Sequence, residues 1–275
     1  MTYVLSEEGR RALRALAEKP ILYAFDFDGT LAPISPDRDA VKLPCSVSEW
    51  LKELSKHAPC AVVSGRALAD LVPRVGGAVP HLIGNHGIES SLTPLPTLLW
   101  AEGVCAGWQR ELETRCAQSL TDLGVDVEAK RYSLTLHYRG TAEFARVRTA
   151  LRRLLEPFSP APRLIYGKDS VNVLPPGQGG KGPAALALMV HLRRIGLFYI
   201  GDDETDEDVF GLTEGLAMGV RVGRSAESRA QFYLQHQGEI EEVIRFLVHR
   251  IDRTPESADE KAGHKSNSKE AAHER

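Results

Sequence analysis

Short apolar runs, each ended by polar or glycine-rich residues, recur in the first third of the chain at residues 21–25, 60–63 and 81–83. Continuous apolar runs of this length are typical of strands that are buried on both faces of a parallel sheet. The intervening segments, near residues 46–57 and 67–72, have helical periodicity. Strands that alternate with helices in this way predict right-handed βαβ units.

The pattern changes near residue 93. Segments with helical periodicity now alternate with pairs of short strands whose residues alternate in polarity. The predicted order is a helix at 98–124, a strand pair within 125–139 with a turn near 130–132, a helix at 142–156, and strands at 163–166 and 170–174. This order is typical of an independent α+β module that lies against a sheet.

The first pattern resumes with a helix at 183–194, a strand at 197–200 and a final helix at 240–251. The predicted fold class is therefore α/β. A Rossmann-like parallel-sheet core, residues 1–92 and 176–252, would carry an inserted α+β cap domain at residues 93–175. Residues 253–275 have mixed charges and few apolar side chains, which predicts a disordered polar tail.

Two carboxylates follow the first predicted strand, in the string Asp26-Phe27-Asp28-Gly29-Thr30. Open α/β sheets bind ligands at the carboxyl ends of their strands. Because ionised carboxylates at this spacing would repel each other, the pair predicts a divalent cation or a shared proton. The alternative is an acidic loop that caps the next segment.

Further polar groups stand at other strand ends and helix starts. Ser64, Gly65 and Arg66 follow the second strand and open a helix, where a hydroxyl and free backbone N–H groups can hold a phosphate. Lys181 opens the helix after the cap, within reach of a phosphoryl oxygen and a carboxylate. Taken singly, Ser64 is better explained as a helix N-cap, and Lys181 as an exposed surface lysine.

An acidic run, Gly201-Asp202-Asp203-Glu204-Thr205-Asp206-Glu207-Asp208, follows the strand at 197–200. Its position favours a Mg²⁺ site over a solvated acidic turn. A parallel sheet brings the ends of its strands to one edge. The aspartate pair, the hydroxyl, the lysine and the acidic run therefore predict, together, one site for phosphoryl transfer.

Composition excludes several classes of protein. The chain has 275 residues, 43% of them hydrophobic and 26% charged, with a formal net charge of −3. Lys and Arg are spread along it, so we expect no nucleic-acid partner. No apolar leader or membrane-spanning window is visible, so we expect no membrane association and a cytoplasmic location.

These motifs resemble the haloacid dehalogenase (HAD) superfamily of phosphatases, and an α+β cap of the C2 type is typical of its sugar-phosphatase branch. Within that branch the chain resembles the trehalose-6-phosphate phosphatases. The strings that carry this resemblance are DFDGTLAPI at 26–34, VVSGR at 62–66, GNHGIE at 84–89, VEAK at 127–130, HYR at 137–139 and GDDETDEDVF at 201–210.

The resemblance implies a Mg²⁺-dependent phosphoric monoester hydrolase that releases trehalose in the last step of its biosynthesis. Asp26 would attack phosphorus and form an aspartyl-phosphate. Asp28 would act as general acid and then as general base. Asp26, Asp202 and the backbone carbonyl of Asp28 would bind Mg²⁺, and Asp203 and Asp206 would orient the metal waters and Lys181.

The same resemblance implies how the substrate is held. Ser64 and Lys181 would stabilise charge on the phosphoryl oxygens, while cap residues would contact sugar hydroxyls. The full set of implied substrate-binding residues is Gly29, Thr30, Gly65, Arg66, Asn85, His86, Glu128, Lys130, Arg139, Lys168 and Asn172. His86 could equally brace its own loop, and His137 is interpreted as a packing residue. The partners implied are a small sugar phosphate and, functionally, a trehalose-6-phosphate synthase.

One segment departs from the family pattern Gly-Lys…Glu-x-Arg-Pro. Here Asn172 stands at the place of the acid and Leu174 at the place of the base. A neutral amide holds sugar hydroxyls less strongly than a carboxylate does. The alternatives therefore include a phosphatase for sucrose phosphate or for glucosyl- or mannosyl-phosphoglycerate, and a phosphosugar mutase. A phospho-accepting signalling module is a further alternative, although such modules lack a cap insertion.

Overall fold

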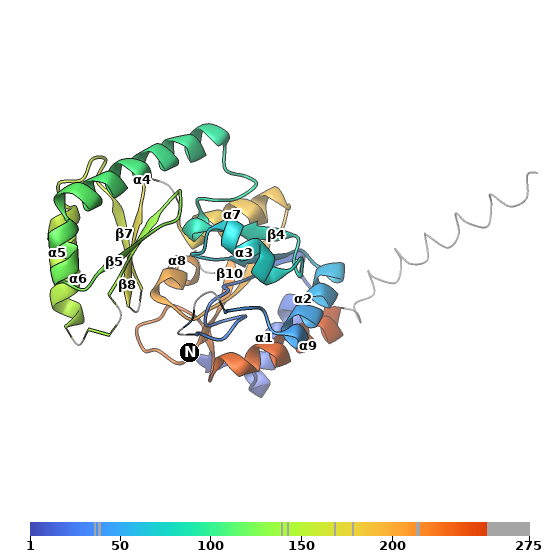
Figure 1. Ribbon diagram of the computed structural model, residues 1–275. Helices are drawn as coiled ribbons and strands as arrows, with labels where there is room; N and C mark the ends of the chain where they lie inside the picture. The colour runs from blue at the N-terminus through green and yellow to red at the C-terminus, as the bar shows by residue number, and fades with distance from the viewer. Residues whose placement is uncertain are drawn as a thin grey trace, which may run out of the picture.

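The computed structural model contains two β-sheets, a large one and a smaller one beside it (Figure 1). It describes residues 1–251 except 36, 38, 39, 139, 142, 168, 178, 213 and 214. The predicted polar tail at 253–275 lies outside this part of the chain. Among the described residues, no helix has both the length and the apolar character needed to cross a membrane.

The large sheet has seven strands in the order β1-β11-β10-β9-β2-β3-β4, paired in parallel. Its strands are β1 (Thr2–Tyr3), β2 (Ile21–Phe25), β3 (Cys60–Val63), β4 (His81–Ile83), β9 (Gly196–Gly201), β10 (Ala217–Val222) and β11 (Phe232–Leu234). The helices beside it are α1 (Glu7–Ala17), α2 (Cys45–His57), α3 (Leu68–Val75), α7 (Lys181–His191), α8 (Glu207–Phe210) and α9 (Ile240–Ile251). Short 3₁₀ turns, η1 (Asn85–Gly87), η2 (Glu204–Asp206) and η3 (Gln237–Glu239), connect several of these elements.

Strand β2 lies at the centre of this sheet because both of its faces are apolar. Tyr23 and Phe25 belong to the apolar cluster that contains residues of α1, α2 and α9. Leu22 and Ala24 belong to a second cluster with residues of α7 and α8. Successive side chains of a strand point to opposite faces, so an uninterrupted apolar run is buried on both sides.

The smaller sheet is antiparallel, with the order β5-β6-β8-β7. Its strands are β5 (Asp126–Ala129), β6 (Leu134–His137), β7 (Arg163–Gly167) and β8 (Ser170–Leu174), and its helices are α4 (Leu95–Arg115), α5 (Ala117–Asp122) and α6 (Phe144–Leu155). Leu134 and Leu136 of β6 pack in an apolar cluster with residues of all three helices. The helices therefore cover one face, and the other face is left for polar side chains (Figure 1).

The predicted fold class is confirmed: a parallel-sheet core with helices carries an antiparallel α+β cap. Three strands, β1, β10 and β11, were not predicted. The predicted helix at 98–124 is two helices, α4 and α5, and α3 continues past residue 72 to Val75 with Pro73 inside it. The apolar side chains of the two sheets fall mainly into separate clusters, and one small cluster joins Ile88 to Ala101 and Tyr132. The division into a core, 1–92 and 176–252, and a cap, 93–175, stays a prediction.

Candidate active site

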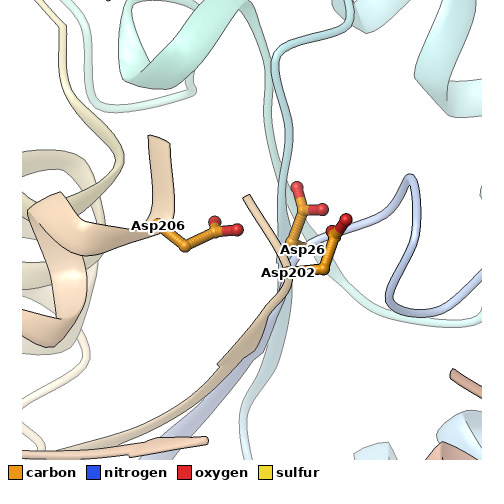
Figure 2. Close-up of side chains that lie close together, drawn as sticks. All are labelled: Asp26, Asp202 and Asp206. Carbon is orange, nitrogen blue, oxygen red and sulfur yellow. The ribbon is translucent and has the colours of Figure 1, made fainter. Parts of the chain in front are cut away.

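The site lies where two adjacent central strands end. Asp26 follows β2 and Asp202 follows β9, and these strands pair with Phe25 opposite Ile200. From β2 the chain continues to β3 on one side, while β9 and β10 lie on the other. Such a switch point leaves a crevice at the carboxyl ends of the strands. Figure 2 shows Asp26 and Asp202 side by side, with Asp206 pointing toward them from a helical turn.

Lys181 neutralises part of this acidic group. Its Nζ donates to Asp26 Oδ1 and to Asp206 Oδ1, both at 2.7 Å, and all three side chains are buried. Burial opposes the charge on Lys181, yet Asp206 and Asp26 raise the pKa of the amine above its usual value. Asp206 also accepts from Tyr199 Oη at 2.7 Å and from the Asp203 N–H at 3.0 Å. Asp206 thus holds Lys181 against Asp26.

Asp26, Asp202 and Asp206 fit a metal ion. One carboxylate oxygen of each lies within 4.8 Å of the others. Burial raises the pKa of Asp26 well above its usual range, and burial together with the charge of Asp206 raises the pKa of Asp202 to about 7. One lysine cannot balance two buried carboxylates and a half-buried one, and divalent cations prefer such oxygen ligands. Because both oxygens of Asp206 already accept hydrogen bonds, Asp26 and Asp202 are the carboxylates that would hold the cation.

Gly29 and Thr30 support Asp202 from behind and do not line the cavity. Thr30 Oγ1, fully buried, donates to Asp202 Oδ1 at 3.2 Å. Gly29 has a φ of +82°, and a Cβ there would lie 2.2 Å from Asp202 Oδ2. A side chain at residue 29 would therefore displace the carboxylate.

Asp28 is held by Arg66. The guanidinium Nε and Nη2 donate to the two carboxylate oxygens of Asp28, each at 2.7 Å. The carboxylate of Asp28 is outside the group formed by Asp26, Asp202 and Asp206. A metal role for its backbone carbonyl stays a prediction.

Ser64 lies at the end of β3, on the floor of the site. Its side chain is buried, and its Oγ accepts from the Arg66 N–H at 3.1 Å. Next to it, a Cβ on Gly65 would meet the His86 ring at 2.5 Å. Ser64 therefore lines the cavity and holds the turn that follows β3. The N-cap of α3 is Ala67, so the interpretation of Ser64 as a helix N-cap was wrong.

A cavity of about 590 Å³ opens above these groups, between the core and the cap sheet. Its volume is within the usual range for small-molecule sites. The predicted site residues that line it are Asp26, Asp28, Ser64, Gly65, Arg66, His86, Lys130, Asn172, Lys181, Asp202 and Asp203. The distant stretches of the chain that carry the candidate chemistry thus meet at one place.

Other predicted residues lie beside the cavity. Asn85 is fully buried, and its amide oxygen accepts from Ser133 Oγ of the cap at 2.7 Å while its amide nitrogen donates to Glu89 at 2.8 Å. Asn85 therefore ties core to cap. Glu128 and Asp206 do not line the cavity either. Arg139 and Lys168 are outside the described residues.

The cap wall presents a small polar network. Lys130 Nζ donates to the Gly65 carbonyl at 3.1 Å and lies 3.7 Å from Glu128 Oε2. His137 Nε2 lies 2.9 Å from the same Glu128 oxygen. Asn172 Oδ1 accepts from Thr135 Oγ1 at 2.9 Å.

Several cavity residues were not predicted. They include Thr135, His137, Asp169, Ser170, Arg221 and Gln235. The cross-strand register would have identified Thr135 as a cavity residue, because Thr135 lies opposite both Glu128 and Asn172. His137 shares its face by alternation, so its interpretation as a packing residue was wrong. Arg221 lies on β10, a strand that the sequence pattern did not reveal.

Comparison with known proteins decides the family. A family model described as trehalose-phosphatase matches residues 24–236. The chain belongs to the trehalose-phosphatase family. It is 32% identical to the trehalose-phosphate phosphatase of Mycobacterium tuberculosis over 259 residues, which cover 87% of this chain. The match spans 64% of that relative, so the chain is similar to about two thirds of its length.

Solved structures of the trehalose-phosphatase type share the fold. The C-terminal domain of the C. albicans trehalose-6-phosphate phosphatase matches with a TM-score of 0.69 and 21% identity, over 90% of this chain and 98% of that one. The Aspergillus fumigatus trehalose-6-phosphate phosphatase matches with a TM-score of 0.57 and 26% identity, over 90% of this chain and 100% of that one. The parallel sheet with its antiparallel cap is therefore the architecture of this family.

Proposed function

We propose that the protein hydrolyses trehalose 6-phosphate to trehalose and phosphate, with Mg²⁺ as cofactor and Asp26 as nucleophile. The observation that carries the proposal is the group of buried Asp26, buried Lys181 and half-buried Asp202 in a cavity that lies between the core and the cap sheet. Family membership and the names of the relatives support trehalose 6-phosphate as the substrate.

Asp26 is suited to attack phosphorus. It stands at the carboxyl end of β2, and Lys181 donates to one of its oxygens, so the other oxygen can face the substrate. Attack by this oxygen forms a P–O bond to Asp26 as the P–O bond to the sugar breaks. Splitting the hydrolysis into two displacements avoids direct attack of water on the sugar phosphate.

Asp28 supplies the proton that the leaving sugar oxygen needs. In the second step, Asp28 takes a proton from water, whose oxygen attacks phosphorus and releases Asp26. Such acid–base help is typically worth about 10²–10⁴-fold in rate. Asp28 lines the same cavity as Asp26, which supports this assignment.

Charge on the phosphoryl oxygens is stabilised by Ser64, which follows β3, and by Lys181, at the start of α7. Asp26 and Asp202 would hold Mg²⁺, which neutralises phosphoryl charge when bound and keeps the nearby carboxylates ionised. Asp206 orients Lys181 and accepts from the Asp203 N–H, and Asp203 and Asp206 would also orient water at a bound Mg²⁺.

The cap selects the sugar in this proposal. Lys130, His86 and Asn172 line the cavity, with Glu128 behind Lys130, and Arg139 and Lys168 stay predictions. Asn172 is neutral, its amide oxygen accepts from Thr135, and its amide nitrogen donates to the Ile165 carbonyl at 3.4 Å, so one N–H is left for a hydroxyl. The cytoplasmic location and the functional link to a synthase also stay predictions from the sequence.

Phosphate release from a panel of sugar phosphates tests this proposal. The panel contains trehalose 6-phosphate, sucrose 6-phosphate, mannosyl-phosphoglycerate and glucose 6-phosphate, each with Mg²⁺ and with EDTA. We expect kcat/KM for trehalose 6-phosphate to exceed that for glucose 6-phosphate by about tenfold or more, because the second glucose unit binds the cap. EDTA should abolish turnover, and added Mg²⁺ should restore it.

Two results would contradict the proposal. Equal turnover of trehalose 6-phosphate and glucose 6-phosphate, or a preference for sucrose 6-phosphate, would reject the substrate. Accumulation of an isomeric sugar phosphate without free phosphate would show a mutase.

A further inference from the structure

Arg66 is the centre of a network that runs from the cavity into helix α3. Its Nε and Nη2 bind both carboxylate oxygens of Asp28, and its Nη1 donates to Asp70 Oδ2 at 2.7 Å. Asp70 in turn accepts from Arg74 Nε at 2.7 Å. Arg74 donates to the carbonyl of Val41 at 2.6 Å, which anchors the network to the loop before α2.

The guanidinium of Arg66 is held in one orientation. The residue is 3% exposed, and its guanidinium carbon lies 5.7 Å from the centre of the Phe27 ring. Burial opposes its charge, but Asp28 and Asp70 together raise the pKa of Arg66 above its usual value. Two-point pairing of a planar guanidinium with a carboxylate fixes the plane of that carboxylate as well as its distance.

This geometry differs from the expected role of Arg66 as a substrate-binding residue. Three of its nitrogens already point at Asp28 and Asp70. Each oxygen of Asp28 has a second lone-pair direction, so the carboxylate can accept from Arg66 and still face the cavity.

We propose that Arg66, held by Asp70, is a positioning residue that aims the Asp28 carboxyl at the leaving oxygen of the substrate. The inference rests on the proposed function, in which Asp28 is the general acid and base. Before the first step Asp28 is protonated on a lone pair that faces the cavity, away from Arg66. This proton passes to the sugar oxygen as its bond to phosphorus breaks, the electron pair of that bond stays on the sugar oxygen, and Arg66 stabilises the carboxylate that Asp28 becomes. A misdirected Asp28 makes this proton transfer slow, whereas attack by Asp26 is unaffected.

The leaving group of the substrate distinguishes a role of Arg66 in proton transfer from a role in phosphate binding. A sugar alkoxide needs a proton to leave, but a 4-nitrophenolate leaves without one. The ratio kcat/KM reports the steps up to the first bond cleavage, so it isolates the acid step from hydrolysis of the aspartyl-phosphate. We therefore compare kcat/KM for trehalose 6-phosphate and for 4-nitrophenyl phosphate in wild-type protein, Arg66→Gln and Arg66→Lys.

For Arg66→Gln we expect kcat/KM to fall by about 10²-fold with trehalose 6-phosphate and by less than about threefold with 4-nitrophenyl phosphate. Arg66→Lys should fall between wild type and Arg66→Gln, because an ammonium binds the carboxylate at one point only. Asp28→Asn should show the same selective loss. Ser64→Ala, which removes a proposed phosphate contact, should lower kcat/KM for both substrates by similar factors.

Arg10→Gln is the matched control. Arg10 also pairs with a carboxylate, Glu242, but it lies on α1 away from the cavity. Arg10→Gln should keep kcat/KM for both substrates near the wild-type values. If Arg66→Gln does not fold, Asp70→Asn carries the test, with a smaller loss that is again confined to trehalose 6-phosphate.

An equal loss with both substrates, in Arg66→Gln or in Asp70→Asn, would overturn the inference and show a phosphate contact or a structural role. An unchanged kcat/KM for trehalose 6-phosphate would also overturn it. Failure of the proposed function is distinguishable, because wild-type protein would then not turn over trehalose 6-phosphate. The same comparison would proceed with the best alkyl phosphate of the panel.

Discussion

At the scale of single residues, burial decides what each polar group in the site can do. Lys181 looks like a surface lysine in the sequence, but in the fold it is 3% exposed and lies between Asp26 and Asp206. A buried charge is tolerated only when it is paired and hydrogen-bonded. Lys181 and the carboxylates therefore depend on one another, and this dependence keeps the site preorganised for a dianionic phosphate.

His86 shows the opposite case, a buried group without a partner. Within the described residues neither ring nitrogen makes a hydrogen bond, although the side chain is 5% exposed and lines the cavity. Burial lowers the pKa of His86 well below its usual value, so the ring is neutral. Unpaired buried nitrogens are costly, which suits a group that binds a hydroxyl of the substrate.

The burial of His86 predicts a pH dependence of stability. Because its pKa is lower in the folded state, the unfolded chain binds the extra proton. The contribution of neutral His86 to the free energy of unfolding is complete above about pH 6.5 and is lost as the pH falls below that value. His86→Asn tolerates the φ of +53° and removes the titration.

We expect the free energy of unfolding of the wild type to fall, relative to that of His86→Asn, by roughly 1 kcal/mol between pH 7 and pH 5.5. Urea unfolding at a series of pH values measures this difference. Parallel pH profiles for the two proteins would show that His86 can be protonated in the folded state.

At the scale of elements, the strands that the sequence predicted are those with unbroken apolar runs. Strands β3, β4 and β8 have the predicted bounds because turn residues end them on both sides. The missed strands lack this signal. Strand β1 has two residues and β11 has three, and the apolar run in the sequence of β10 is interrupted by Gly219 and Arg221. Their pairing depends on neighbours that are distant in the sequence.

The separate apolar clusters predict that the cap can be loosened by itself. Leu136 of β6 is fully buried among the cap helices, whereas Val127 of β5 is 37% exposed. Leu136→Ala should cost about 2–5 kcal/mol of stability, and Val127→Ala should cost less than about 0.5 kcal/mol. Hydrogen exchange should accelerate in β5–β8 but not in β2 and β3. Equal acceleration in both sheets would show one cooperative unit.

At the scale of the whole molecule, the sequence predicted which polar residues meet at one cavity better than it predicted their contacts. Asp26, Ser64, Lys181 and Asp202 meet because parallel strands end at one edge of the sheet, a rule that needs no coordinates. The partners of Arg66, Asn85 and Thr30 could not be predicted, because they depend on loop geometry and on the contact between cap and core. Arg66, Asn85 and Thr30 were predicted to bind the substrate, and in the fold each hydrogen-bonds to another side chain.

In the proposed function these distant stretches of the chain serve one nucleophile, Asp26. The measurement that tests this role is phosphate release from trehalose 6-phosphate by Asp26→Asn at saturating Mg²⁺. The amide keeps the size of the side chain but cannot attack phosphorus, so we expect a loss of about 10³-fold or more in kcat with unchanged thermal stability of the fold. Turnover by Asp26→Asn within about threefold of wild type would contradict the assignment, because it is far smaller than the loss that removal of a nucleophile causes.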